Sequence, residues 1–484
     1  MVGSLSIIGE EQHGDDECDT AVAFNVSDKD TGVEARAFRG KAAVVTLGCA
    51  KNQVDSEVML GVLRREGFVL TKDVKDAEVV VVNTCSFLQS SVKESIDCIL
   101  DVSEQKKNGR LRKLIVAGCL VERYKEDLKK TLPEVDSFIS IDDLLKVGDV
   151  ASGGVASDLR NAARPYFLYD DSTPRQLSTR PHTAYVKISE GCNRPCTFCI
   201  IPKLRGAMRS RTMASVLEEV KALGARGIRE VNLVAQDSTA YGTDLKGPGV
   251  ATLLRELNKA SAVDWIRLLY AYPVGLDKEL LDTIADCERV VEYLDLPLQH
   301  ASEAVLKRMQ RPLGKYSPRA VVEFIRSYKP SIHLRTTFIV GFPGETEEDI
   351  DALEALVSEG HFTNVGVFTY SREEGTPSHG YEGHLPEKVK SERRKRVMLA
   401  QQEVNRKRLE SMIGQSVEVL IEGTHEETDL LLSGRTRFQA PDVDGTVIIN
   451  DVAPELTVAP GALGRVEISE CAGYDLIGKL KQVC

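Results

Sequence analysis

A chain of 484 residues is long enough for about two to four domains. Its hydrophobic content of 42% is ordinary for a globular protein, and no apolar run approaches the ~20 residues of a membrane span, which argues against a helical membrane protein. The formal net charge of −11 argues against a protein that mainly binds the nucleic-acid backbone. It better suits a protein that binds a basic partner.

Residues 1–40 are acidic and contain no basic stretch that leads into an apolar core. We therefore expect a disordered extension here rather than a signal peptide or a transit peptide. Eleven cysteines in a long chain without a secretory signal indicate a reducing compartment, which we take to be the cytoplasm. In such a compartment cysteines serve as ligands more often than as disulfides.

Three β-branched runs between residues 41 and 150 each end just before a cysteine. The cysteines are 36 and 34 residues apart, a period that fits one strand plus one crossover helix. Such runs predict a parallel sheet covered on both faces, whose strands end at one edge. Cys49, Cys85 and Cys119 would then share that edge and could bind one cluster, or they could simply be small residues buried in turns. Cys98, in the middle of a predicted helix, is expected to pack.

A linker is predicted over residues 151–181, which are rich in Gly, Ser, Asp and Arg and contain three prolines. Between residues 182 and 410 the chain again alternates strands with helices. Six such units predict a barrel or a partly open barrel, with its chemistry at the carboxyl ends of the strands. The predicted strands are Tyr185–Ile188, Glu230–Val234, Trp265–Leu269, Val291–Leu296, His333–Val340 and Val365–Tyr370.

Three cysteines with the spacing C-x3-C-x2-C follow the first of these strands: Cys192, Cys196 and Cys199. They can reach one iron–sulfur cube, which normally takes four cysteines, so one iron stays open to an outside ligand. That arrangement suits reductive chemistry on S-adenosylmethionine, with Phe198 placed to contact the adenine or to anchor the loop. The alternatives are cysteines that merely pack and a zinc site without its fourth ligand, for which His182 is a poor candidate.

Polar residues also follow other predicted strands of this segment, at 236–238, 299–300 and 341–345. Each group could hold part of a cofactor or a substrate. Each could equally form a turn or begin a helix, because Asp, Gly and Glu are ordinary residues in those positions.

Residues 411–484 contain five short alternating runs, which predict a small β-barrel. Small barrels often bind nucleic acid through a basic face that carries aromatic side chains. This segment has twelve acidic and five basic side chains, and its only aromatic residues are Phe438 and Tyr474. Its charge would repel RNA phosphates and attract a basic protein.

The loop SEGCNRPCTFCIIPKLRG resembles the radical S-adenosylmethionine signature, and the chain from about residue 41 to residue 481 is similar to the methylthiotransferase family. The resemblance does not extend to the segment before residue 41. Four further stretches carry the resemblance: LGCAKNQVDSE at 47–57, NTCSF at 83–87, LDLPLQHA at 294–301 and TFIVGFPGETEED at 337–349.

The resemblance implies an α/β protein of three domains. These are a parallel α/β sheet domain at 41–150, a radical S-adenosylmethionine (β/α) partial barrel at 182–410, and a TRAM-like β-barrel at 411–484. It also implies two [4Fe–4S] clusters, the first held by Cys49, Cys85 and Cys119, and the second, which binds S-adenosylmethionine, by Cys192, Cys196 and Cys199.

The implied reaction is methylthiolation of the β-carbon of an aspartate in ribosomal protein S-twelve. It needs an electron donor and a sulfur source, and we expect neither a membrane nor direct tRNA binding. The sequence AKNQ at 50–53 departs mildly from the branch of the family that acts on this ribosomal protein, and further from the tRNA branch. Two alternatives are a tRNA adenosine methylthiotransferase and a non-catalytic RNA-binding or electron-transfer protein, although electron-transfer clusters normally use four cysteines.

Overall fold

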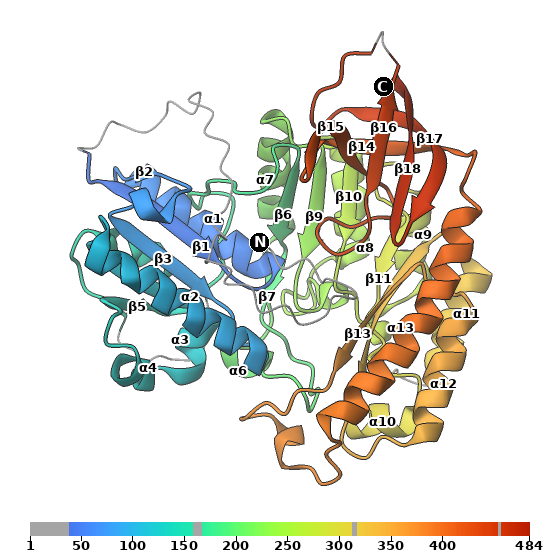
Figure 1. Cartoon of the computed structure of the whole chain (residues 1–484), viewed down its shortest axis with the longest axis horizontal. Helices are drawn as coiled ribbons and strands as arrows, with labels where there is room; N and C mark the ends of the chain where they lie inside the picture. The colour runs from blue at the N-terminus through green and yellow to red at the C-terminus, as the bar shows by residue number, and fades with distance from the viewer. Residues whose placement is uncertain (1–37, 158–166, 312–316, 454–455) are drawn as a thin grey trace. The chain divides into compact units, whose positions relative to one another are not determined.

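The computed structural model describes residues 38–157, 167–311, 317–453 and 456–484, so most of the predicted extension and the middle of the predicted linker lie outside the described residues (Figure 1). Within these ranges no helix is both long and apolar enough to cross a membrane. The chain divides into two compact units. The first comprises Met1–Arg180, Tyr185–Asn193 and Cys199–Arg211, and the second comprises Pro181–Ala184, Arg194–Phe198 and Thr212–Cys484.

A five-stranded parallel sheet forms the centre of the first unit, which confirms the predicted fold of this segment. Its order is β2-β1-β3-β4-β5, and the strands are β1 (Lys41–Thr46), β2 (Val69–Leu70), β3 (Val79–Thr84), β4 (Lys113–Gly118) and β5 (Ser137–Ile139). The register pairs Thr46 with Asn83, and Asn83 with Ala117. The three strands that precede a cysteine therefore end side by side.

Helices cover both faces of this sheet. One face packs on α1 (Ala50–Arg65), η2 (Ile141–Lys146) and α5 (Val147–Ala151), and the other on α2 (Gln89–Asn108), α3 (Cys119–Tyr124) and α4 (Glu126–Thr131). Alternate residues of one strand enter the two cores, as Val44 and Val45 do. This double burial explains why the strands are apolar without interruption. Cys98 packs in the core on the α2 face, as predicted.

The remaining part of the first unit is a small loop structure around two cysteines. It contains a short antiparallel pair, β7 (Ser189–Glu190) and β8 (Arg209–Ser210), and the helix α6 (Ile201–Arg205). Ser189 pairs with Ser210, so the residues just before Cys192 lie beside the residues that follow α6. Strand β6 (Thr183–Lys187) crosses the division between the units, because its first two residues belong to the second.

Strands and helices alternate through the second unit, as the sequence predicts. The strands pair in parallel as β9-β10 and β11-β12-β13; they are β9 (Glu230–Val234), β10 (Trp265–Leu268), β11 (Tyr293–Asp295), β12 (His333–Val340) and β13 (Asn364–Thr369). The helices before and between them are α7 (Met213–Ala225), α8 (Val250–Ala260), α9 (Lys278–Asp286), α10 (Glu303–Arg308), α11 (Pro318–Tyr328) and α12 (Glu347–Ser358). Each predicted strand agrees with the structure to within about two residues, the usual uncertainty of element ends.

A long helix, α13 (Glu387–Glu410), leads into a closed barrel with the order β14-β15-β16-β18-β17. Its strands are β14 (Ser416–His425), β15 (Thr428–Thr436), β16 (Val447–Val452), β17 (Leu463–Ala472) and β18 (Asp475–Val483). The predicted five-stranded barrel is confirmed, but most strands are longer than their alternating patterns indicate. Register shifts interrupt the alternation, for example between Ile421 and Gly423, and hide the strand ends from a pattern of period two.

The barrel is attached to the rest of the second unit through buried charges. Glu230, in β9, binds both Arg267 of β10 and Arg435 of the barrel, and Arg435 also binds Glu422 at 2.8 Å. Burial would raise the pKa of Glu230, but the charges of Arg435 and Arg267 outweigh it and lower that pKa below its ordinary value. Phe438 of the barrel adds an aromatic contact at the same junction, because its ring stacks on His333 with 4.6 Å between the ring centroids.

We expect Glu230→Gln to destabilise the second unit by about 3–5 kcal/mol at neutral pH, because it leaves two buried guanidinium groups with too little negative charge. The pKa of Glu230 is lowered on folding, so its contribution is complete above its unfolded pKa of about 4.3 and is lost as the pH falls through the folded value. Chemical unfolding curves should therefore differ most at neutral pH and converge in acid. Glu403→Gln, which removes an ion pair on the exposed surface of α13, is the control and should leave the curve unchanged.

Candidate functional site

The first three predicted ligands lie at one edge of the parallel sheet, directly after β1, β3 and β4. Cys49 precedes α1 and is exposed, whereas Cys85 and Cys119 are buried. Gly48 has a φ of +90°, and a Cβ atom there would lie only 2.9 Å from the Sγ of Cys85. A glycine is thus required at this position for the loop of Cys49 to approach Cys85.

Asn52, in the first turn of α1, ties the ends of these strands together. Its buried side-chain Nδ2 donates to the carbonyl oxygens of Leu47, after β1, at 2.8 Å and of Thr84, at the end of β3, at 2.9 Å. Its Oδ1 lies 4.0 Å from the Sγ of Cys119, after β4, and accepts a hydrogen bond from Arg205. One amide therefore fixes the three positions that carry the cysteines.

A buried cluster of four charges stands next to Cys119. Arg205 Nη1 lies 2.7 Å from Asp55 and 3.1 Å from Glu190, while Arg205 Nη2 donates to the Sγ of Cys119 at 3.4 Å. Lys187 binds the same two carboxylates, at 2.5 Å and 2.6 Å. The cluster balances its own charge, which is what burial of four ions requires, and it places a positive group on a cysteine sulfur.

The three thiols differ in acidity. Loss of hydration raises the pKa of Cys119 to about 12, and it also raises the pKa of Cys85. The same effect opposes ionisation of Cys49, but the charges of Lys51 and Arg205 outweigh it and lower the pKa of that thiol. Three thiols supported by nearby cationic groups suit a metal centre of thiolate ligands, because metal binding replaces the thiol proton.

In the described ranges no three His, Cys, Asp or Glu side chains are grouped so as to bind one metal ion. An iron–sulfur cube is ligated differently, because each cysteine binds a separate iron atom. Three cysteines at neighbouring strand ends thus fit a [4Fe–4S] cluster with one iron open, and their role as its ligands stays a prediction.

Two cysteines of the second predicted set, Cys192 and Cys199, belong to the first unit. The backbone N–H of Cys192 donates to the carbonyl of Gly206 at 3.1 Å, which closes the loop over α6. Gly191 before it has a φ of +80°, and a Cβ atom there would lie 2.2 Å from the carbonyl oxygen of Ala207. As at Gly48, the residue that precedes a predicted ligand has to be glycine.

Cys196 belongs to the second unit and is surrounded there by cationic and aromatic groups. Arg311, itself buried, donates from Nη1 to the Sγ of Cys196 at 3.5 Å and stacks over the ring of Tyr272 at 4.2 Å. Arg194 covers the same ring at 4.1 Å and pairs with Asp237 at 2.6 Å. The sulfur of Cys196 is therefore in direct contact with a buried positive charge.

The backbone around Cys196 is also held by hydrogen bonds within the second unit. Thr197 N–H donates to the carbonyl of Met309 at 2.9 Å, and the carbonyl of Thr197 accepts from the N–H of Ser378 at 3.0 Å. Phe198 is half-buried, and its contact with an adenine stays a prediction. His182, the poor zinc candidate, is buried with its Nε2 3.7 Å from Glu422.

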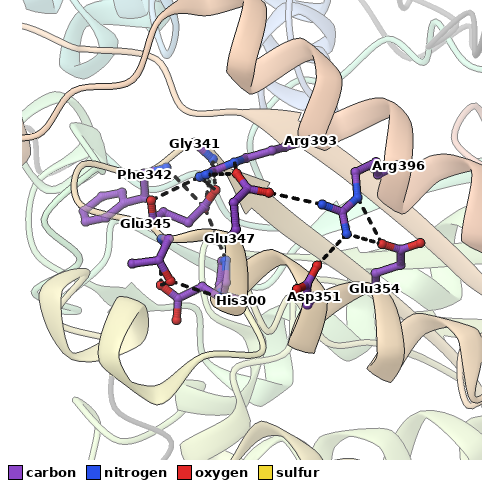
Figure 2. A network of polar contacts seen from close by, with 11 residues as sticks. His300, Gly341, Phe342, Glu345, Glu347, Asp351, Glu354, Arg393 and Arg396 are labelled. Atoms are coloured by element: carbon purple, nitrogen blue, oxygen red, sulfur yellow. Dashed lines mark hydrogen bonds and ion pairs between the residues drawn. The ribbon is translucent and has the colours of Figure 1, made fainter.

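The polar residues at the ends of β11 and β12 form a structural network, which Figure 2 shows. The carboxylate of Glu345 accepts from the N–H of Gly341 at 2.8 Å and pairs with Arg393 of α13 at 2.7 Å. His300 faces the same carboxylate at 3.3 Å. These contacts stabilise the turn after β12 and join that turn to α13.

α12 and α13 are held together by a second group of contacts in Figure 2. Arg396 of α13 pairs with Asp351 at 2.7 Å and with Glu354 at 2.5 Å.

Asp237, after β9, caps the short helix η3 (Ser238–Ala240) by accepting from the N–H of Ala240 at 3.2 Å. At these strand ends the structure thus supports the turn and helix-start alternatives, while the cofactor alternatives stay predictions.

Sequence reasoning missed the polar residues that support the cysteines. These are Asn52, Asp55, Lys187, Glu190, Arg205, Tyr272 and Arg311. A signal was present for some of them, because the first turns of α1 contain a run of polar residues that are all buried. Several decisive partners lie more than a hundred positions apart, as Asp55 and Arg205 do, so these contacts could not be read from the chain.

Three family descriptions match the chain. Residues 41–140 match the uncharacterized protein family UPF0004, residues 186–357 match the radical SAM superfamily, and residues 413–480 match the TRAM domain. Among solved structures, the radical S-adenosylmethionine methyltransferase TsrM from Kitasatospora setae, with cobalamin and a [4Fe-4S] cluster bound, aligns with a TM-score of 0.50. It is 17% identical and covers 68% of this chain and 74% of its own, so the likeness concerns the fold alone.

Several curated relatives carry the name ribosomal protein uS12 methylthiotransferase RimO. The relative from Geotalea uraniireducens (strain Rf4) is 46% identical over 92% of this chain and 99% of its own length. Those from Geobacter sulfurreducens and Anaeromyxobacter sp. are 47% and 48% identical, over 91% and 90% of this chain and 98% and 92% of their own lengths. The protein is a radical S-adenosylmethionine transferase whose cofactors are [4Fe–4S] clusters and S-adenosylmethionine. With close to half of its residues identical over nine-tenths of its length, the chain belongs to the RimO family of methylthiotransferases.

Proposed function

We propose that this protein methylthiolates the β-carbon of an aspartate in ribosomal protein uS12. The observation that carries the proposal is the similarity, over nearly the whole chain, to relatives named for that substrate. The arrangement of cysteines supports it, because two sets of three ligands give two clusters that each keep one iron free for a reactant.

The two sets of cysteines divide the work. When bound, the clusters supply the electron for cleavage of S-adenosylmethionine at Cys192, Cys196 and Cys199, and a sulfur-bearing site at the first set. The chain's own residues orient these centres. Asn52 and Gly48 set the positions of the first three cysteines, and Arg311 provides a positive charge at Cys196.

The C-terminal barrel supports a protein substrate over tRNA. Several of its carboxylates are neutralised inside the second unit, such as Glu422 by Arg435 and Asp444 by Arg335. Two carboxylates at the junction of β14 and β15 are exposed, Glu427 in the turn and Asp429 at the start of β15, next to Leu430, which is 91% exposed. An acidic and apolar surface of this kind suits a protein that itself binds rRNA phosphates and is therefore basic.

One of the two aromatic residues of the barrel is engaged within the second unit. Phe438 already stacks on His333, and the guanidinium of Arg408 lies 5.5 Å from the centre of its ring. We therefore propose that the barrel does not bind tRNA. A ribosomal substrate, an electron donor and a sulfur source would all be met in the cytoplasm, which we propose as the location.

Iron analysis tests the ligand roles. Anaerobic reconstitution should load about eight irons per chain, since each cube holds four. Replacing Cys192, Cys196 and Cys199 together with alanine should halve the iron content and abolish formation of 5′-deoxyadenosine. Cys98→Ala is the matched control and should retain all the iron, because that thiol packs in the core. Formation of 5′-deoxyadenosine by the triple variant would contradict the role of the loop.

Mass spectrometry tests the substrate. Intact uS12 from cells that carry the gene should be heavier by one methylthio group than uS12 from cells that lack it. Nucleoside analysis of tRNA from the same cells should show no difference. An unchanged uS12 together with loss of a methylthioadenosine from tRNA would replace the proposal with the tRNA alternative.

Charge reversal tests the recognition of uS12. Glu427→Lys combined with Asp429→Lys should raise KM for uS12 and leave the basal cleavage of S-adenosylmethionine unchanged, because the substitution removes attraction without touching a cysteine. Asp127→Lys, which reverses an exposed carboxylate in α4, should leave KM unchanged. Equal KM values for the wild type and the double variant would show that uS12 docks elsewhere.

A further inference from the structure

Arg205 belongs to the buried charge cluster and touches a predicted ligand. The residue is 1% exposed, and its Nη2 donates to the Sγ of Cys119 at 3.4 Å. A guanidinium in this position brings both a hydrogen bond and a full positive charge to the sulfur.

The orientation of Arg205 is fixed from several sides. Asp55, in α1, and Glu190, in β7, hold its Nη1, while Nη2 also donates to Asn52. Lysine has a single charged nitrogen at the end of a flexible stem, whereas the planar guanidinium can bind two carboxylates, an amide and a sulfur at once. The contact with Cys119 is therefore built into the site.

Substitutions in the cluster change the net charge near Cys119 in a predictable direction. Arg205 and Lys187 supply two positive charges, and Asp55 and Glu190 supply two negative ones. Removal of Arg205 leaves the surroundings of Cys119 more negative by one charge. Neutralisation of Asp55 leaves them more positive by one charge, with Arg205 still in place.

We propose that Arg205 is a positioning residue that sets the reduction potential of the cluster ligated by Cys49, Cys85 and Cys119. This inference rests on the ligand roles proposed above. Reduction adds an electron to the cluster, so a hydrogen bond to a ligand sulfur and a nearby positive charge both favour the reduced state and raise the potential. The potential then governs how readily this centre accepts an electron while the other set of cysteines serves S-adenosylmethionine.

The experiment uses the full chain with Cys192, Cys196 and Cys199 replaced by alanine, which isolates the first cluster. After anaerobic reconstitution, iron content is measured and the midpoint potential is determined by a redox titration followed by electron paramagnetic resonance. In this background Arg205→Gln should shift the midpoint to a more negative potential, and Asp55→Asn should shift it to a more positive one. Damage to the fold alone would not produce shifts of opposite sign.

Glu57→Gln is the matched control, because it removes a buried carboxylate from the same helix. Glu57 binds Arg175 at 2.6 Å and Ser178, and neither of these is a residue of the charge cluster. It should leave the midpoint unchanged. Where Arg205→Gln loses its iron, the positive shift of Asp55→Asn carries the test.

Three results would overturn the inference. The first is an unchanged midpoint in both variants with iron retained. The second is a shift of the same sign in both. The third is a background protein without iron, which would remove the ligand role of Cys49, Cys85 and Cys119 and so contradict the proposed function as well; the first two results leave that function standing.

Discussion

The need to neutralise charge inside the first unit determines how its functional loops are built. A guanidinium that is almost fully buried requires carboxylates as partners. Arg205 pairs with Asp55 of α1 and with Glu190, just before Cys192. The same pairing fixes the helix that follows Cys49 and the strand that precedes Cys192. Two loops that lie far apart in the sequence are thereby bound to the same guanidinium group of Arg205. Each loop carries part of a different set of cysteines.

The strands and the cores could be predicted because their signal is local. In the first unit the uninterrupted runs at 43–47, 79–82 and 114–117 reflect burial on both faces of a parallel sheet. Their regular spacing placed the following cysteines at one edge, and the register of β1, β3 and β4 shows that these strands do end together. The barrel strands were predicted too short, because bulges break the alternation that defines them.

The polar half of the site could not be predicted in the same way. Asp55 and Arg205 are 150 positions apart, and nothing in the local pattern of either tells which partner it has. The turn after β12 shows the opposite limit. Gly341 and Glu345 look like candidates for ligand binding, but their hydrogen bond and the ion pair of Glu345 stabilise the turn itself and join it to α13. A polar residue at a strand end marks a place where function is possible, and only the contacts decide how the residue is used.

The junction between the barrel and the strands before it bears on how this part of the chain can be exchanged in evolution. Arg435 of the barrel pairs with Glu422 inside the barrel and with Glu230 of β9 outside it, and Asp444 pairs with Arg335 of β12. A barrel transplanted alone onto another protein would keep its hydrophobic interior. Its buried ions would then face a surface that lacks the matching opposite charges. The C-terminal segment is thus a closed barrel in the pairing of its strands and part of a larger body in its electrostatics, so a successful transplant would have to move β9 and β12 with it.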